Sequence, residues 1–384
     1  MSDMLSMNHL VLQEMAEENA KYTGQETVVE AYSCPQDERI ARAALIKRVR
    51  IRIAGCGGAG SNTIDRLMQS RVDGADLLAI NTDAQHLNMI KSKAKLLIGR
   101  RRTKGEGAGG FPKIGEEAAL EEVNKIRELL RGSDIAFITC GLGGGTGTGS
   151  APIVARAAKE TGATVFTIVT LPFKSEGTER MNNAIGGLEK LIRYSDTILA
   201  IPNDKIVAES PSRNVNEAFN FADSVLAETI KGLTELITKT GVVNIDYADV
   251  SNILKIGRTA VVGIGESDDD KDKVLSAVKN AINFPLIDAD ISTARGCLVS
   301  VIGGDEITVK EFERALAEIQ SRIHPDATVK WGCRVEPGMN GKIKVMTLLV
   351  GVKSPFSVNT PEDIRNIERI VGDMRGTSDI DFIR

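Results

Sequence analysis

The sequence has few residues of the kinds that usually carry redox or metal chemistry. Its 384 residues include five cysteines and three histidines, and aromatic residues make up only 4%. The cysteines are widely spaced and form no CxxC pair or zinc-ligand pattern (Cys34, Cys56, Cys140, Cys297 and Cys333). Reduced thiols in a cytosolic protein are therefore expected, and no metal-binding set of side chains is predicted. Carboxylates, backbone amides and a bound metal ion remain as the groups on which chemistry could depend.

Signals for membrane spanning and nucleic-acid binding are also missing. No apolar run approaches the ~20 residues of a membrane span, and residues 1–20 lack the apolar centre of a signal peptide. The formal net charge of −4 argues against the basic surface that nucleic acids require. We therefore expect a cytoplasmic protein without direct membrane insertion and without a nucleic-acid partner.

The first part of the chain has the pattern of an α/β domain. Residues 1–48 are polar and mixed and predict an N-terminal extension, whereas residues 49–213 alternate short β-branched runs with helix-period segments. Such alternation is typical of a parallel sheet covered on both faces, with ligands beyond the carboxyl ends of its strands. The predicted strands are 49–54, 77–80, 135–140, 164–170 and 197–201, and the predicted helices include 62–69, 115–131 and 151–160.

A long helix separates this part from a second domain. Apolar residues recur at helical spacing from Val215 to Lys239, which predicts a central helix within residues 214–240. Residues 241–352 predict a smaller α+β domain, and residues 353–384 predict a flexible tail. In the second domain the predicted strands are 260–264, 296–301, 328–332 and 344–350, and the predicted helices are 270–282 and 309–323.

Two glycine-rich loops follow predicted strands and precede predicted helices. Gly55–Gly60 reads GCGGAG, a GxGxxG pattern with Asp83 about 20 residues further on, which is the fingerprint of dinucleotide binding. Gly141–Gly149 reads GLGGGTGTG, and its backbone amides with the hydroxyls of Thr146 and Thr148 suit a nest for phosphate oxygens. The first loop alone leaves an NAD-dependent oxidoreductase open. Together the two loops predict a site for a di- or triphosphate.

The second loop and several further segments resemble the tubulin/FtsZ family of GTPases. The family signature is GGGTGTG at Gly143–Gly149, and the similarity runs from Ile53 to about Val352, roughly four-fifths of the chain. Further similar segments are Asn81–Asp83, Gly107–Gly110, Leu171–Phe173, Ile201–Asn203 and Asn244–Asp249. The paired glycines Gly109 and Gly110, in a third loop, together with Asp223, resemble the archaeal form of the family. The resemblance implies a tubulin-like, Rossmann-type GTPase domain, a long central helix and a smaller second domain.

The resemblance also assigns roles to residues around the nucleotide. It implies phosphate contacts for the glycine-rich loops, a γ-phosphate sensor at Ala108–Gly110, ribose contacts for Glu176 and Arg180, and guanine recognition by Asn203 and Asp223 with Phe219 stacking. An acceptor carboxylate suits guanine, because adenine would leave its oxygens unpaired. The implied GTP or GDP contacts are Gly57, Gly58, Ala59, Gly60, Ser61, Asn62, Asn81, Asp83, Ala108, Gly109, Gly110, Gly143, Gly144, Gly145, Thr146, Gly147, Thr148, Gly149, Glu176, Arg180, Asn203, Phe219 and Asp223.

Hydrolysis needs a group that positions water, and the two phosphate loops contain no acidic pair. Asp246 and Asp249 form such a pair at a predicted helix start, where i, i+3 spacing projects both to one side; they could orient water or a hydrated cation, or only cap the helix. Asp246 and Asp249 follow the long helix, whose ~24 residues rise about 36 Å. At this distance they could hardly reach the γ-phosphate of their own subunit, so a head-to-tail neighbour should supply them. The resemblance implies the same composite site, with Asn244, Asp246 and Asp249 acting on the neighbour's GTP in a division filament, with Mg²⁺ as the expected ion.

Three residues depart from the usual pattern of the family. Phe111 stands where asparagine is usual beside the γ-phosphate loop, and Lys255 and Arg258 stand where small or uncharged residues are commoner. A GTP-binding filament scaffold with slow turnover therefore stays open as an alternative. At the other end, residues 379–384 (DIDFIR) resemble the short family peptide that binds a membrane-tethering division protein. The resemblance to the family as a whole implies a filament at the mid-cell division site.

Overall fold

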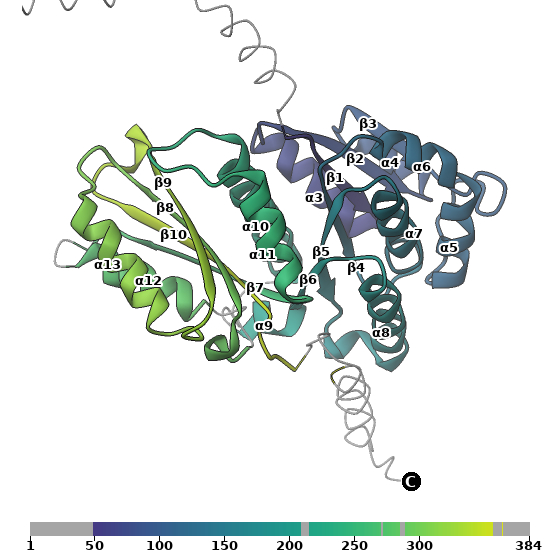
Figure 1. Cartoon of the computed structure of the whole chain (residues 1–384). Coiled ribbons are helices and arrows are strands. Elements are labelled where there is room, and N and C mark those ends of the chain that lie inside the picture. Colours follow the sequence, from purple (N-terminus) through teal and green to yellow (C-terminus); the bar gives the residue numbers. More distant parts are fainter. Residues whose placement is uncertain (1–48, 209–214, 270–271, 285–288, 356–362, 364–384) are drawn as a thin grey trace, which may run out of the picture. The chain divides into compact units, whose positions relative to one another are not determined.

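The computed structural model describes residues 49–208, 215–269, 272–284, 289–355 and 363. The predicted N-terminal extension and the terminal peptide 379–384 lie outside these residues. Within the described residues, strands and helices alternate along the first part of the chain as the sequence predicts (Figure 1). Its elements are β1 Ile51–Cys56, α3 Gly57–Gln69, β2 Ala75–Asn81, α4 Ala84–Met89, β3 Ala94–Leu97, α5 Pro112–Glu121, α6 Val123–Leu130, β4 Ile135–Gly141, α7 Thr146–Glu160, β5 Thr164–Leu171, η1 Lys174–Glu176, α8 Thr178–Ile192, β6 Thr197–Pro202 and α9 Asn203–Ala208.

The strands of this part pair in parallel, because each is followed by a helix that returns the chain to the same end of the sheet. The order β3-β2-β1-β4-β5-β6 reverses direction along the sheet between β1 and β4. Their buried, β-branched runs are typical of strands covered on both faces: every residue of β5 is buried. A sheet of this kind has its binding edge at the carboxyl ends of the strands, next to such a reversal.

Two apolar cores lie on the two faces of this sheet. One contains Ile53, Phe137 and Ile168 from the strands, with Ile64 of α3 and Ile230 of the long helix. The other contains alanines, leucines and isoleucines of the helices α5 to α8, which cover the opposite face. Several of the buried residues of α7 are alanines, whose short side chains allow this helix to lie close to the strands.

The second part of the chain continues the same sheet. Strand β7 pairs in parallel with β6 over only two residue pairs, and β10 then pairs antiparallel with both β7 and β8. Helices α12 and α13 cover one face of these strands and close a third core with Val278, Val299 and Ile319. The elements are α11 Tyr247–Ile256, β7 Thr259–Ser267, α12 Lys273–Ile282, η2 Ile291–Thr293, β8 Gly296–Gly303, α13 Val309–Gln320, β9 Thr328–Val335, η3 Pro337–Met339 and β10 Ile343–Val350.

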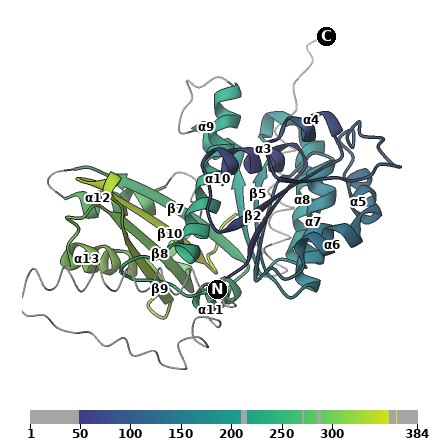
Figure 2. The same ribbon diagram turned by 90° about the horizontal axis from the view of Figure 1, so that it is seen from above.

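Helix α10 (Val215–Thr238) connects the two parts, as the apolar periodicity predicts. Its buried residues Leu226, Ile230 and Leu233 join the core between α3 and the sheet. The helix is continuous over 24 residues, and it lies between the strands of the first part (β1–β6) and those of the second (β7–β10) (Figures 1 and 2). It therefore fixes the separation between the segments at its two ends.

One predicted helix is two helices in the structure. The segment predicted as a single helix over 115–131 breaks at Glu122, where φ is −111° and ψ is 17°. The break redirects the chain so that both α5 and α6 pack against α7. Helical periodicity cannot show this change, because tertiary packing and not local propensity decides it.

Candidate functional site

The two glycine-rich loops meet at the carboxyl edge of the sheet. They follow β1 and β4, which are neighbouring strands in register, with Cys56 opposite Cys140. The loops are in direct contact, since a Cβ added to Gly57 would lie 2.6 Å from the backbone nitrogen of Gly147. Helices α3 and α7 begin inside these loops, at Gly57 and Thr146. Their free N–H groups and positive helix ends therefore point to one place, as anion binding requires.

The glycines of the two loops fall into two groups with different reasons for lacking a side chain. A Cβ on Gly145 would lie 2.8 Å from the Cβ of Ala108 and from the Phe111 nitrogen, and a Cβ on Gly149 would collide with the carbonyl oxygen of Pro112. Those glycines allow the loops to pack on one another. A Cβ on Gly58 or Gly144 would have no atom of the described chain within 4 Å. These two positions leave open space where a ligand can approach the backbone.

A matched pair of substitutions separates these two reasons. Gly144→Ala is expected to preserve the melting temperature but to weaken GTP binding, because the added methyl group enters the open space beside the loop. Gly149→Ala is expected to destabilise the fold, because α5 and α7 must move apart to relieve the collision. Thermal unfolding and nucleotide titration of both variants measure these effects. Equal destabilisation by the two would contradict the division into packed and open glycines.

The threonines of the second loop hold the loops in place. Thr146 Oγ1 lies 2.6 Å from the Oγ1 of Thr82, which follows β2. Thr148 is buried, and its Oγ1 accepts a hydrogen bond of 2.8 Å from the Gly143 N–H. Gly143 has a φ of +104°, a conformation that favours glycine. The loop is therefore preorganised by its own side chains before any ligand binds.

The third loop, Ala108–Gly110, lies against the second. Ala108 is buried, and the Asn183 amide of α8 is 3.5 Å from the carbonyl oxygens of both Gly110 and Gly143. Phe111 is the N-cap residue directly before α5, and it is 59% exposed. This departure from the family pattern therefore places an exposed aromatic ring beside the loop.

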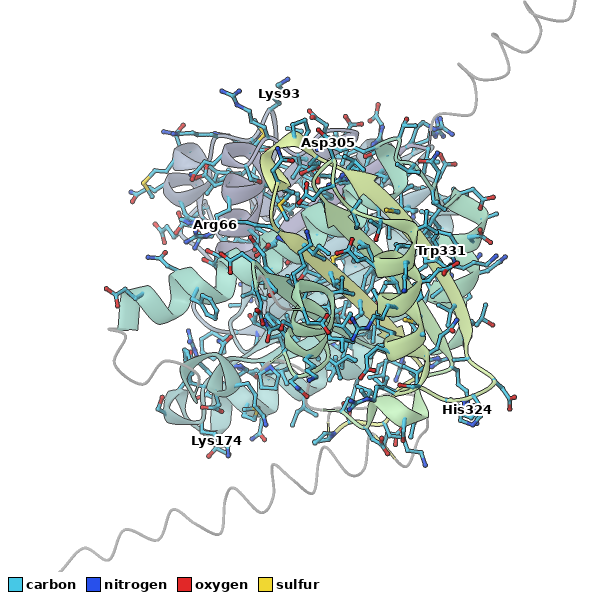
Figure 3. All side chains as sticks on the ribbon, turned by 90° about the vertical axis from the view of Figure 1, so that its left-hand side faces the viewer. Arg66, Lys93, Lys174, Asp305, His324 and Trp331 are labelled. Atoms are coloured by element: carbon cyan, nitrogen blue, oxygen red, sulfur yellow. The ribbon has the colours of Figure 1, made fainter. Side chains whose placement is uncertain are left out.

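Asp223 of α10 lies in a polar network beside the first loop. Its carboxylate is 3.9 Å from the Arg66 guanidinium and accepts a hydrogen bond from Asn62 (Figure 3 labels Arg66). Burial raises the pKa of Asp223 to about 6, although Arg66 and Asn62 both act to lower it. The carboxylate is thus ionised at neutral pH but poorly solvated, and it would gain from hydrogen-bond donors on a ligand.

The network continues from Asn62 to α4. His86 Nε2 lies 3.0 Å from Asn62 Oδ1, and His86 Nδ1 lies 3.1 Å from the Asn81 amide nitrogen. This pattern fits the tautomer with its proton on Nε2, which donates to Asn62 and leaves the Asn62 amide free to donate to Asp223. Asp83 caps α4 by accepting a 2.9 Å hydrogen bond from the His86 N–H. Asn81 and Asp83 therefore shape the turn that holds His86.

Further predicted residues surround the same edge. Asn203 begins α9 directly after β6; it is buried, and its Oδ1 has no hydrogen-bond partner among the described residues. The Ser61 hydroxyl is buried without a described partner as well. Glu176 and Arg180 form an ion pair, and Glu176 also accepts from the Phe173 N–H at 2.9 Å. Phe219 lies in α10, but its side chain is outside the described part.

The predicted catalytic residues lie together at the other end of α10. Asn244 Oδ1 accepts from the Gly241 N–H at 2.6 Å, and Asp246 caps α11 by accepting from the Asp249 N–H at 2.7 Å. Asp223 and Thr238 are 15 residues apart in one α-helix (238 − 223), which corresponds to roughly 22 Å of rise. In Figure 2, α3, α4 and α9 lie on one side and α11 on the opposite side. The carboxylates and the glycine-rich loops of one chain are therefore separated.

Sequence reasoning missed four residues of these networks. Thr82, Arg66, His86 and Asn183 contact predicted residues from other elements. His86 is isolated from the other histidines in the sequence, so no pattern marks it as a site residue. The signal that could have identified His86 is its position three residues after Asp83. A side chain in the first turn of a helix can reach the loop that precedes the helix.

The comparisons with known proteins agree with this geometry. Residues 50–210 match the GTPase domain of the tubulin/FtsZ family, and residues 258–353 match the C-terminal domain of the FtsZ family. The chain is similar to cell division protein FtsZ 1 of Pyrococcus horikoshii (44% identity over 339 residues, 88% of this chain and 91% of that protein). It is similar to cell division protein FtsZ 1 of Methanocaldococcus jannaschii (46% over 320 residues, 83% and 88%).

Solved structures give the same result. The empty FtsZ dimer of M. jannaschii superposes with a TM-score of 0.78 at 45% identity, covering 83% of this chain and 92% of that one. A GTPγS-bound protofilament of CetZ2 from Haloferax volcanii superposes with a TM-score of 0.71 at 25% identity, covering 86% and 100%. Among the described residues, no helix has the length and apolar character to cross a bilayer.

Proposed function

The chain belongs to the tubulin/FtsZ family, with archaeal FtsZ 1 proteins among its relatives, and from this premise we propose that it is a GTP-hydrolysing filament protein of cell division. Its subunits assemble head to tail, and each active site is completed by the next subunit. The observation that carries the proposal is the pairing of a preorganised phosphate nest with carboxylates beyond the opposite end of α10, a helix that rises roughly 22 Å between Asp223 and Thr238 alone.

The nucleotide pocket has complementary groups for a guanine nucleotide. The open backbone at Gly58 and Gly144 and the starts of α3 and α7 bind the phosphates. Asp223 accepts from N1–H and the exocyclic amine of guanine, and the unpartnered Asn203 Oδ1 gains a donor there. Adenine offers no such pair of donors, so the buried carboxylate would remain unpaired with ATP. Glu176 and Arg180 contact the ribose, and Phe219 stacks on the base.

The composite site follows from the position of the second set of residues. Asn244 and Asp246 lie in the loop before α11, and Asp249 lies in the first turn of that helix. Apolar residues are exposed in both regions: Phe111 beside the loop Ala108–Gly110, Met89 (70% exposed) at the end of α4, and Val242 (73% exposed) two residues before Asn244. A head-to-tail contact would bury these groups and bring the carboxylates to the neighbour's γ-phosphate. Repetition of a heterologous contact of this kind gives an open filament.

The reaction joins a water oxygen to the γ-phosphorus and breaks its bond to the bridging oxygen, giving GDP and phosphate. Asp249 orients the water and accepts its proton, and Asp246 keeps α11 in position by capping it. Mg²⁺ is the expected counter-ion, but no group of three or more metal-ligating side chains occurs in the part of the chain that the structure describes. Phosphate oxygens, water and at most Asp83 would hold the ion, which would neutralise charge on the phosphates.

We divide the chain by function into a GTP-binding domain (49–213), a central helix (214–240) and a domain that activates the neighbour's GTPase (241–352). Residues 1–48 and 353–384 flank these parts. The oxidoreductase alternative explains only the loop at Gly55–Gly60 and gives no role to the GGGTGTG loop. A filament scaffold with slow turnover differs from the proposal only in rate.

Light scattering and phosphate release, followed together over a range of protein concentrations, test the proposal. With GTP, turnover per subunit is expected to rise steeply at the concentration where scattering begins. With a slowly hydrolysed analogue, scattering should persist without phosphate release. Filaments that release almost no phosphate from GTP would favour the scaffold alternative, and turnover that is independent of concentration would contradict the composite site.

We also propose that the filament is tied to the membrane at mid-cell through residues 379–384. These lie outside the described residues and combine the apolar Ile380, Phe382 and Ile383 with charged neighbours. A short segment of this type can fill a groove on a tethering protein. Deletion of residues 379–384 is expected to leave assembly in solution unchanged and to prevent recruitment to the division site in cells; normal recruitment of the truncated chain would contradict this role.

A further inference from the structure

Lys330 of β9 forms an ion pair with Asp249. Its Nζ lies 2.8 Å from Asp249 Oδ1, and the two side chains are 41% and 31% exposed. Both Asp249 and Asp246 act to raise the pKa of Lys330. The ammonium group is therefore held next to the two carboxylates that the proposed function brings to a neighbour's nucleotide.

The position of Lys330 is fixed by the way the loop before α11 attaches to β9. Val243 and Cys333 exchange two backbone hydrogen bonds of 3.2 and 3.1 Å. A Cβ on Gly332 would lie 3.2 Å from the Val243 carbonyl oxygen, so the loop and the strand are in close contact. Trp331 packs against Phe312 with ring centroids 4.6 Å apart, which holds this stretch of β9 on α13. These contacts hold the loop that leads into α11 against β9, the strand that carries Lys330.

The positive charge of Lys330 affects how closely Asp249 can approach a triphosphate. A carboxylate that approaches a triphosphate brings a negative charge to a negative substrate, and a cation beside it offsets that repulsion. Groups that stabilise charge on a transferring phosphoryl group make large contributions to the rate, also when a second protein supplies them. An exposed ion pair contributes little to folding stability, so its ammonium group can change partners when an interface forms.

We propose that Lys330 is a further catalytic residue of the site that two subunits form. In the free subunit its ammonium group donates to Asp249; in the filament it donates to an oxygen of the neighbour's terminal phosphate, while Asp249 remains available to the attacking water. The proposal rests on the proposed function, because it needs Asp249 to act across the interface. Figure 3 agrees with this placement: Trp331, next to Lys330, lies on the opposite side of the view from Arg66 at the nucleotide pocket.

The opposite hypothesis is that Lys330 only restrains Asp249 in the free subunit. The two hypotheses differ in the effect on turnover that they predict for loss of the Lys330 side chain. If Lys330 is catalytic, Lys330→Met lowers turnover in preformed filaments by roughly 100-fold, the usual effect of losing one group that stabilises charge in the transition state. If Lys330 is only a restraint, the same substitution leaves turnover unchanged or raises it.

The experiment measures phosphate release per pelleted subunit for the full chain, beside GTP affinity and the assembly threshold. Lys330→Met should lose turnover while GTP affinity stays unchanged, and Lys330→Arg should restore most of the activity because it keeps the cation. Lys342→Met, an exposed lysine before β10, is the matched control for the lost charge and should behave as the unsubstituted chain. Unchanged or faster turnover of assembled Lys330→Met would overturn the proposal.

Asp249→Ala, measured in parallel, keeps this inference separate from the proposed function. If Asp249→Ala loses turnover and Lys330→Met does not, only the role of Lys330 fails. If Asp249→Ala keeps full turnover, the composite site itself fails, whatever Lys330→Met does. If Lys330→Met does not assemble with GTP, its filaments can be formed with a slowly hydrolysed analogue and then exchanged into GTP to measure the rate of phosphate release. A loss of that rate that Lys330→Arg does not restore would also count against the proposal.

Discussion

Asp249→Ala is expected to bind GTP with unchanged affinity and to lose turnover by roughly 10²–10⁴-fold, the usual contribution of a positioned proton acceptor. The pocket should be unaffected, because Asp249 lies beyond the far end of α10 from Asp223. The fold should be unaffected as well, because the cap of α11 uses the Asp249 N–H and the Asp246 side chain, and both remain. Phosphate release at saturating GTP and calorimetric titration of GTP measure the two quantities.

Asp305→Ala is the matched control for Asp249→Ala. Asp305 is an exposed carboxylate of the same part of the chain, in the turn before α13, and Figure 3 labels it. Its loss should change neither binding nor turnover. Filaments of Asp249→Ala should persist longer than those of the unsubstituted chain, because GTP remains in them. Turnover of Asp249→Ala within a few-fold of the unsubstituted chain would contradict the assigned role.

Asp223→Asn is expected to weaken GTP binding by roughly 10²–10⁴-fold, since two hydrogen bonds to a charged group, at ~1.5–3 kcal/mol each, are replaced by at most one to a neutral amide. An asparagine amide presents one acceptor and two donors, so it cannot accept from both N–H groups of guanine. It can donate to the second oxygen of xanthine while accepting from N1–H. The preference between GTP and xanthosine triphosphate should therefore invert, which simple damage to the pocket would not produce.

The same substitution should stabilise the nucleotide-free protein. Burial raises the pKa of Asp223 to about 6 in the folded chain, above its ordinary value of 3.8. An acid with a raised pKa favours the folded state when protonated, so this contribution is fully present below pH 3.8 and is lost as pH rises through about 6. At pH 7 the ionised group therefore costs on the order of 1–3 kcal/mol, which Asp223→Asn removes.

The pH dependence of GTP binding follows from the same pKa. Below about pH 6 the carboxyl group of Asp223 is protonated and cannot accept both hydrogen bonds, so GTP affinity should fall with decreasing pH. The affinity of Asp223→Asn should lack this dependence. Thermal unfolding without nucleotide and titration across this pH range provide both measurements; a destabilised Asp223→Asn would contradict the account of a poorly solvated carboxylate.

The sequence predicted the architecture well because local patterns determine much of it. The buried, β-branched run at Thr164–Leu171 is a strand in the structure, and the apolar periodicity from Val215 is the 24-residue α10. The two glycine-rich loops meet at one edge, since parallel neighbouring strands place the loops that follow them side by side. The family assignment is confirmed by the comparisons.

The remaining features depend on contacts between distant residues, which the sequence does not reveal. Helix α3 begins at Gly57 and not at the predicted Asn62, because packing of the loops stabilises helical turns that glycine alone disfavours. The glycines looked alike in the sequence, but only their surroundings separate the open Gly144 from the crowded Gly149. The ion pair of Lys330 with Asp249 joins residues of two elements that no spacing rule connects.

The shared active site is tested most directly by mixing two inactive variants. Asp223→Asn retains Asp246 and Asp249 but not the guanine site, and Asp249→Ala retains the guanine site but not the catalytic carboxylate. The mixture is expected to release phosphate although neither variant does so alone, because the loop of one chain completes the pocket of the other. A mixture that sediments as joint filaments and remains as inactive as its components would contradict a site formed between subunits.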